Sequence, residues 1–291
     1  MRLLATAIGQ ALITGVALGV IFGLVALGFV VIYQVAGVLN FAQGSFVVWG
    51  GLFSAWLVSD LGWSSILALV ASVLTAMGLG VAVGRVAVSV RQHGETAALI
   101  VTVGIGIVLE GVFLALFGDQ PLSFSAPIGQ QAWHLANVVV LPEQALMAGL
   151  GAVVVLAVQW LLRRTIWGMA LRACAANPAS ARLFGMDPRR MATIAFAIAG
   201  GVGGLVGYLV TPMTGMDFGS DVTWTINGFS AAIVGGLGDP LWAVGGGLAL
   251  GLVESFLGTF GSSAYETAGA LVAMLVVLLW RPQGLFIRRA S

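Results

Sequence analysis

The stretch that decides the fold is RRTIWGMALRACAANPASARLFGMDPRR, residues 163–190. It lies between two long apolar runs and holds six of the twelve arginines: Arg163, Arg164, Arg172, Arg182, Arg189 and Arg190. An arginine at the centre of a bilayer costs about 2.5–3.5 kcal/mol on insertion scales, so six guanidinium groups cannot share the hydrocarbon core. The stretch is therefore predicted to be a loop outside the bilayer, between two membrane spans.

Local signals predict a short helix at about residues 178–184 inside this loop. Asn177-Pro178 is typical of a helix start, because Asn accepts a backbone N–H and Pro has no N–H to leave unpaired. Gly185 is typical of a helix end, since glycine takes the left-handed conformation without steric cost. Asp187-Pro188 repeats the start signal before the next apolar run. A helix this short is marginal in water, which favours docking on a partner; an incidental turn in a solvated loop is the alternative.

The composition is that of a polytopic helical membrane protein. Of 291 residues, 59% are hydrophobic and 8% are charged, whereas soluble domains carry roughly 25% charged residues. No Asp, Glu or Arg occurs between Leu3 and Ser59, and this length suffices for two crossings at about 20 residues each. Arg2 and the apolar run after it resemble a signal peptide. However, the run is longer than the hydrophobic region of a signal peptide, so we interpret it as a retained first span. The single cysteine, Cys174, excludes an intramolecular disulfide.

Eight or nine crossings are expected. Longer apolar runs predict spans at about 7–33, 64–84, 96–117, 143–162, 188–210, 240–258 and 267–280. Two further runs, 45–59 and 223–237, are short for a crossing and are interpreted as broken or half helices. The polar segment 34–45 is expected to be non-helical backbone that is buried in protein or lines a cavity. Whether the two short runs cross completely is left open by the sequence.

The arginines also predict the orientation. If the spans alternate, all arginines except Arg2 fall on one side of the membrane. Most carboxylates outside the apolar runs fall on the other side: Asp60, Asp119, Glu143, Asp217, Asp221 and Glu266. The positive-inside rule places the arginine-rich side in the cytoplasm. We therefore expect a cytoplasmic C-terminus and an external segment 118–142.

The sequence contains no catalytic or metal-binding constellation. The chain has no lysine, so the phosphate-binding pattern G-x-x-x-x-G-K-[ST] is impossible and ATP binding by a P-loop is excluded. Two histidines, both outside the predicted spans, and one cysteine do not make a metal or nucleophile site. We expect a protein that is not an enzyme and has no cofactor or metal of its own.

Polar residues in or beside the spans are the candidates for a translocation path. Glu110 and Glu254 lie within apolar runs, where a carboxylate costs about 2.5–3.5 kcal/mol and therefore usually faces the bundle interior or a cavity. Asn40, Gln43 and Asn227 lie in or beside the broken segments. Each of the five either lines a path or is a hydrogen-bonded packing residue.

Seven short motifs are spread along the chain: ALG at 26–28, LNFAQG at 39–44, LIVTVG at 99–104, GMALRA at 168–173, ARLFGM at 181–186, VGGLG at 234–238 and RPQGLF at 281–286. Together they resemble the membrane permease subunits of branched-chain amino acid ABC importers, the high-affinity leucine/isoleucine/valine family. The resemblance covers essentially the whole chain. One departure is Gln43, which stands where many members have histidine.

This resemblance implies an all-α fold of the ABC importer permease type, one permease domain over residues 1–291, and a multi-pass location in the bacterial inner membrane. It implies a second permease subunit, two ABC ATPases that bind the ATP, and a periplasmic substrate-binding protein. No nucleic acid partner is implied. The loop helix would be the coupling helix that docks on an ATPase subunit, through Pro178, Ala181, Arg182, Leu183, Phe184 and Gly185.

The substrate and two other classes of protein stay open. Branched-chain amino acids are the first expectation, but relatives with this pattern also carry urea, short amides or aromatic acids. An ATP-independent transporter or channel would use Glu110 or Glu254 as an ion or proton site. A structural membrane subunit would have no path at all. Binding of an ATP-hydrolysing partner would separate the importer from both. The sequence does not say whether the two permease subunits are identical.

Overall fold

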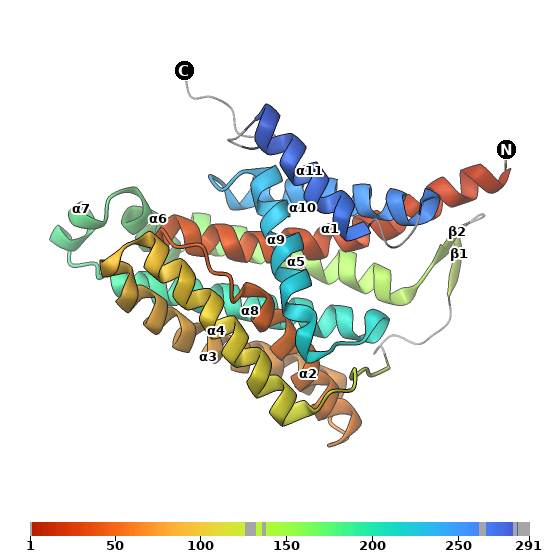
Figure 1. Cartoon of the computed structure of the whole chain (residues 1–291), viewed down its shortest axis with the longest axis horizontal. Helices are drawn as coiled ribbons and strands as arrows, with labels where there is room; N and C mark the ends of the chain where they lie inside the picture. Colours follow the sequence, from red (N-terminus) through yellow and green to blue (C-terminus); the bar gives the residue numbers. More distant parts are fainter. Residues whose placement is uncertain (1, 126–131, 136–137, 262–265, 282–283, 285–291) are drawn as a thin grey trace.

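The computed structural model describes residues 2–125, 132–135, 138–261, 266–281 and 284 (Figure 1). Arg288 and Arg289 of the predicted cytoplasmic tail lie outside the described residues. The helices and strands are α1 (Arg2–Ala36), α2 (Gln43–Ser59), α3 (Ser65–Val90), η1 (Arg91–His93), α4 (Glu95–Phe117), β1 (Trp133–Leu135), β2 (Val138–Val140), α5 (Pro142–Arg164), α6 (Ile166–Ala176), α7 (Pro178–Leu183), α8 (Pro188–Thr214), η2 (Phe218–Ser220), α9 (Asp221–Gly235), α10 (Pro240–Phe260) and α11 (Glu266–Trp280).

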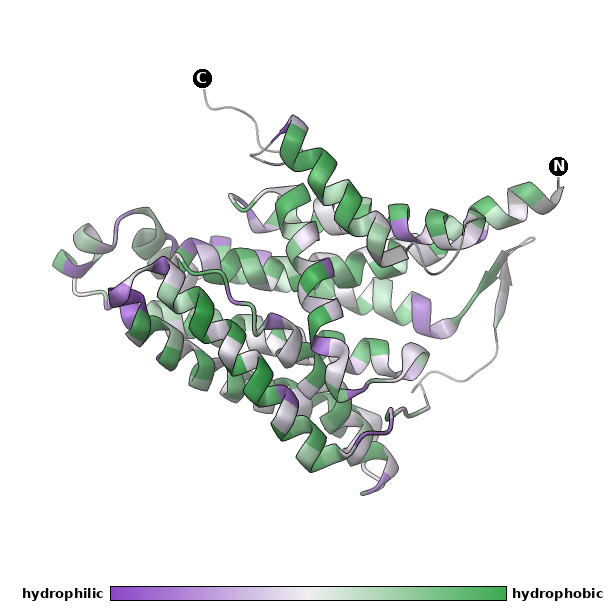
Figure 2. Ribbon diagram, viewed as in Figure 1, coloured by the Kyte–Doolittle hydropathy of each residue, from purple (hydrophilic) through white to green (hydrophobic). Residues whose placement is uncertain are grey.

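The long helices run between two ends of the molecule. One end, called the arginine end, carries the residues Arg85, Arg91, Arg163, Arg172, Arg182, Arg189 and Arg190, which line three neighbouring cavities. Helix α7 lies at this end, and the β1–β2 hairpin lies at the opposite end together with the start of α1 (Figure 1). Hydrophobic residues dominate the helices between the two ends, and hydrophilic residues gather toward them (Figure 2).

Within the described residues, six helices are long and apolar enough to cross a membrane: α1, α3, α4, α5, α8 and α10. Helix α2 has 17 residues, and α9 and α11 have 15 each, which is short of the roughly 20 residues of a full span. The predicted all-α polytopic fold with short, broken helices is confirmed.

Glycines bring α1 and α10 into backbone contact. A Cβ added at Gly247 would collide with the backbone of Gly23, and one at Gly251 would collide with the backbone of Gly19. Small residues allow such close approach in lipid, where hydrophobicity does not drive helices together. Helix α10 starts as predicted, with Asp239 Oδ1 accepting a hydrogen bond from Leu241 N at 2.8 Å.

A second glycine contact joins α8 to α3. A Cβ at Gly80 would collide with the carbonyl oxygen of Phe196, and one at Gly200 with the carbonyl oxygen of Ala76. Helix α8 also starts as predicted, because Asp187 Oδ1 accepts from Arg189 N at 2.9 Å and Pro188 occupies the first turn.

One arrangement therefore occurs twice, in opposite directions. Helix α1 packs along α10 as α8 packs along α3, and the short helix α2 packs on α8 as α9 packs on α1. Helix α1 runs toward the arginine end, whereas α8 runs away from it (Figure 1). Inverted repeats with discontinuous helices recur in membrane transport proteins, where the breaks lie near the middle of the bilayer.

Both breaks return the chain into the bundle before the short helix begins. After α1, Gly37 has φ +60°, which glycine adopts without a Cβ clash. The side chain of Gln43, the first residue of α2, then lies against Gly28 of α1. Gly28 and Gly37 are nine residues apart, which is about 13 Å along a helix. Helix α2 therefore starts well inside the bundle. Residues 215–220 follow the same course after α8 and lead to the start of α9.

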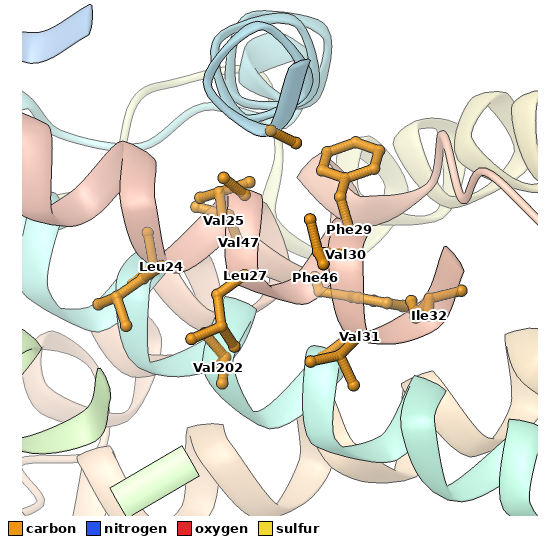
Figure 3. Packing of buried hydrophobic residues seen from close by; sticks show 14 of the residues in the cluster. Leu24, Val25, Leu27, Phe29, Val30, Val31, Ile32, Phe46, Val47 and Val202 are labelled. Atoms are coloured by element: carbon orange, nitrogen blue, oxygen red, sulfur yellow. The ribbon is translucent and has the colours of Figure 1, made fainter. Parts of the chain in front are cut away.

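The core lies where these breaks meet α1 and α8. Figure 3 shows Leu27 and Phe29 of α1 together with Phe46 of α2 and Val202 of α8. Phe29 also packs on Phe41 of the first break, with ring centroids 6.4 Å apart in an edge-on arrangement. Aromatic and branched side chains fill the space around the first break, so this segment is enclosed by protein rather than by lipid.

Helix α6 and the β1–β2 hairpin were not predicted. Residues 166–176 of the basic stretch form α6, whose start Thr165 caps by accepting from Gly168 N at 3.1 Å. In the predicted external segment, β1 and β2 pair antiparallel with Trp133 opposite Val140. The stretch 163–190 is thus mostly helical rather than a loop with a single short helix.

Candidate functional site

Helix α7 has the capping that its sequence predicts. Asn177 Oδ1 accepts hydrogen bonds from Ala179 N and Ser180 N, both at 3.0 Å. At the other end, Met186 N donates to Ala181 O at 3.1 Å and Gly185 N donates to Arg182 O at 3.0 Å. Gly185 has φ +78°. This is the Schellman pattern, which ends a helix through a left-handed glycine. The two caps hold a helix of 6 residues that would otherwise fray.

The end of α7 presents apolar side chains to the outside. Leu183 is 87% exposed and Phe184 is 81% exposed, whereas Ala181 is buried against the rest of the chain. Arg182 lies behind this tip and lines a cavity with Arg91 and Arg189. An exposed pair of large apolar residues rimmed by cations is typical of a protein interaction site.

Cys174 of α6 lies in the same region and is buried. Burial raises the pKa of its thiol above the usual range, and the Asp187 carboxylate adds to this effect. The thiol is therefore kept protonated and shielded, which fits a packing role and not a reactive one.

The second candidate site is the junction where the two broken segments meet. Gly44 N at the start of α2 donates to Thr225 Oγ1 of α9 at 3.0 Å, and Thr225 Oγ1 donates to Phe41 O at 3.3 Å. Ser45 Oγ donates to Asp221 Oδ2 at 3.4 Å. The N-termini of both short helices thus lie in one region, where Thr225 of α9 satisfies backbone groups of the first break and of α2, and Ser45 of α2 pairs with the Asp221 side chain of α9.

Helix α4 closes one side of this junction. Thr102 Oγ1 accepts from Phe41 N at 3.2 Å and lies 3.3 Å from Leu39 O. Thr102 is fully buried, so these contacts replace the hydrogen bonds that an irregular backbone would lack inside a bilayer.

Two of the five predicted path residues belong to the first break. Asn40 is fully buried, and its Oδ1 accepts from Ala42 N at 3.2 Å. Gln43 is also buried, and its Nε2 donates to Ala199 O of α8 at 3.3 Å. Asn40 Nδ2 and Gln43 Oε1 are buried without a hydrogen-bond partner within the described residues. Each amide therefore keeps one free polar atom inside the bundle, which costs stability unless something else pairs with it.

The other three predicted path residues lie at different depths in the bundle. Glu110 of α4 is partly exposed and lies beside Gly219, within the same junction. Asn227 is buried on α9, about a turn and a half after Asp221. Glu254 is buried on α10 next to Ser255, which donates to Ala11 O of α1. Gly28, which lies against Gln43 at the junction, is 17 residues from Ala11, or about 25 Å along α1, so Glu254 lies far from the junction.

Sequence reasoning missed Asp221, Ser45 and Thr225 as junction residues. The sequence predicted Asp221 to lie in an external loop, but it is the first residue of α9 and only 6% exposed. One signal was available, because Asp221 and Thr225 are four residues apart and share a helix face. Within the described residues, no group of three His, Cys, Asp or Glu side chains could hold a metal ion.

Comparison with known proteins identifies the family. Residues 11–280 match the family described as branched-chain amino acid transport system / permease component. The chain is 27% identical to the high-affinity branched-chain amino acid transport system permease protein LivH of Escherichia coli (strain K12), over 96% of this chain and 95% of LivH. It is 25% identical to the ribose import permease protein RbsC of the same strain, over 88% of this chain and 81% of RbsC.

A structural comparison matches 94% of this chain to 92% of a chain in PsaBC from Streptococcus pneumoniae in complex with Fab, with a TM-score of 0.49 and 15% sequence identity. The family match rests on the sequence comparisons, which cover nearly the whole chain. They agree with the apolar spans and the buried helix breaks described above. The chain belongs to the family of branched-chain amino acid transport permeases and is a multi-pass membrane permease subunit of an ABC importer.

Proposed function

We propose that the chain forms half of the translocation path for branched-chain or related amino acids. A periplasmic binding protein delivers the substrate, and two separate ATPase subunits bind the ATP and drive transport. A second permease subunit completes the path, and residues 1–291 act as one permease domain. The names of relatives such as LivH support the amino acid substrate, and the ribose permease RbsC marks sugars as the competing class.

The exposed tip of α7 is the observation that carries this proposal. Leu183 and Phe184 are large apolar side chains at the arginine end, and they are 87% and 81% exposed. A water-exposed helix of this length needs a reason to be rigidly capped at both ends. Docking into a groove of an ATPase subunit buries both side chains, and the caps then transmit movement of the ATPase to α6 and α8.

The broken-helix junction is the part of the path that this chain contributes. Asn40 and Gln43 hold free polar atoms there, and Glu110 lies at its edge. Asn227 continues the polar row along α9, and Glu254 would act at a separate depth on α10. Breaks at the N-termini of two short helices place backbone dipoles toward a passing substrate without a permanent pore.

The test is uptake by the complete importer in proteoliposomes. Radiolabelled leucine should accumulate only when this chain, its partner permease, the ATPase subunits, the loaded binding protein and internal ATP are all present. Ribose, which represents the sugars, and urea, which represents urea and short amides, are added as competitors of leucine. Leucine uptake that is unchanged when this chain is omitted, or that ribose alone competes away, would contradict the proposed function.

The arginine end is proposed to be cytoplasmic, from the positive-inside rule. Single cysteines at Ser125 and Ser180, in a Cys174→Ser background, should then label from opposite sides of the membrane. Both positions are exposed. An impermeant maleimide should label position 125 in intact cells and position 180 only after the membrane is opened. Labelling of position 180 in intact cells would reverse the orientation.

A further inference from the structure

Three carboxylates lie beside the broken-helix junction: Glu110 of α4, Asp217 just before η2 and Asp221 of α9. A Cβ added at Gly219 would lie 3.5 Å from Asp217 Oδ1 and 3.7 Å from Glu110 Oε1. Likewise, a Cβ at Gly106 would lie 3.7 Å from Asp221 Oδ2 and 3.7 Å from Ser45 Oγ. Because neither glycine has a side chain, each leaves space for about one methyl-sized group, at Gly219 beside Asp217 and Glu110 and at Gly106 beside Asp221 and Ser45.

Asp221 is the member of this cluster that its own chain does not satisfy. It is 6% exposed, and while Oδ2 accepts from Ser45 Oγ, Oδ1 is buried without a hydrogen-bond partner within the described residues. The ion pairs Arg163–Asp239 and Arg190–Asp187 lie at the arginine end. In the described part of the chain none of the three acidic residues has an arginine partner. A buried carboxylate of this kind is costly unless a cation or donor pairs with it.

Asp217, the remaining carboxylate of this cluster, is hydrogen-bonded within its own turn. It contributes negative charge rather than an unpaired acceptor atom. Asp217 Oδ1 accepts from Gly219 N at 2.9 Å, and Oδ2 accepts from Ser220 Oγ at 2.7 Å. Asp221 and Glu110 are thus the groups with acceptor atoms to offer a ligand. Both lie nearer the opposite end than the arginine end, since Glu110 is seven residues, or about 10 Å, from the end of α4.

The chemistry of this cluster selects a primary ammonium group rather than a metal ion. Within the described residues, no group of three or more His, Cys, Asp or Glu side chains could hold a metal ion. An ammonium group instead carries three N–H donors that reach separate acceptors. We propose that Asp221 and Glu110, with Asp217 beside them, bind the ammonium group of the amino acid substrate as it enters from the opposite end. This inference rests on the proposed function.

Binding can be measured directly on the whole importer in nanodiscs, without the binding protein. The probe is isopentylammonium chloride, which has the branched body and ammonium group of leucine but no carboxylate. Isothermal titration calorimetry should show saturable binding. Sodium chloride at equal ionic strength and sodium isovalerate should show none. Asp221→Asn should weaken binding at least about tenfold, because a charge-assisted hydrogen bond is lost, and Glu110→Gln should weaken it less.

Asp119→Asn is the matched control, since Asp119 is an exposed carboxylate just beyond α4. Its affinity for isopentylammonium should equal that of the wild type. Absence of saturable binding, equal binding of sodium, or unchanged affinity in both junction variants would overturn the proposal. If Asp221→Asn does not assemble, Glu110→Gln carries the test, because Glu110 is partly exposed.

Leucine uptake by the same preparation separates this inference from the proposed function. Uptake without isopentylammonium binding would contradict the ammonium site and leave amino acid import intact. Isopentylammonium binding that Asp221→Asn abolishes, without any leucine uptake, would support the site and contradict the proposed import.

Discussion

Replacing Leu183 and Phe184 together by aspartate is expected to reduce ATP-driven uptake to background. Both side chains project from the tip of α7, at 87% and 81% exposure, and make few contacts within the chain. A buried apolar anchor contributes about 2–4 kcal/mol to a protein interface, so loss of two should weaken ATPase binding by 100-fold or more. Aspartate also places two charges where the partner is apolar.

This loss should occur without damage to the fold. The caps of α7 use Asn177, Gly185 and backbone atoms, all of which remain. Leu61→Asp, in an exposed turn at the opposite end, is the matched control. It should retain the ATPase subunits during purification. The double variant should insert and purify as wild type but lose them. Normal uptake by the double variant would show that α7 has no part in coupling.

Gly251→Val is expected to prevent correct folding. The added Cβ would occupy the space of the Gly19 backbone where α1 and α10 touch. Neither helix backbone can move without opening the contacts at Gly23 and Gly247. Overpacking of a tight contact costs about 1–3 kcal/mol and sometimes more. Size-exclusion chromatography in detergent should show aggregation, or a lower thermal midpoint if the protein assembles.

Gly149→Val is the control for the helix propensity of valine. Gly149 is also in the interior of a helix, but no atom lies within 4 Å of an added Cβ there. It should elute as wild type and keep the wild-type midpoint. Equal destabilisation by the two substitutions would mean that the α1–α10 contact does not depend on close glycine packing.

The parts of the fold that could be predicted are those with local causes. Asn177-Pro178, Asp187-Pro188 and Asp239-Pro240 each start a helix as their sequence indicates, because a cap bonds to backbone only two or three residues away. The broken runs were also predictable, since polar residues such as Asn40 cannot face lipid without cost.

The parts that were missed depend on contacts between distant segments. Ser45 and Asp221 are 176 residues apart, and nothing near Asp221 indicates that it is drawn into the bundle. Helix α6 was missed because the arginines around it dominate the pattern, although Thr165 is an ordinary cap. Of the predicted path residues, Glu110 reaches the junction and Glu254 does not, because the packing of α10 on α1 places Glu254 beside the start of α1.

The most direct test of the account is photocrosslinking from the tip of α7. A benzoyl-phenylalanine at position 184 in the assembled importer should crosslink to an ATPase subunit on irradiation. The same group at position 61, in the opposite-end turn, should not. If position 184 gives no crosslink, or a crosslink no stronger than that at position 61, the claim that this chain is coupled to ATP hydrolysis through α7 is contradicted.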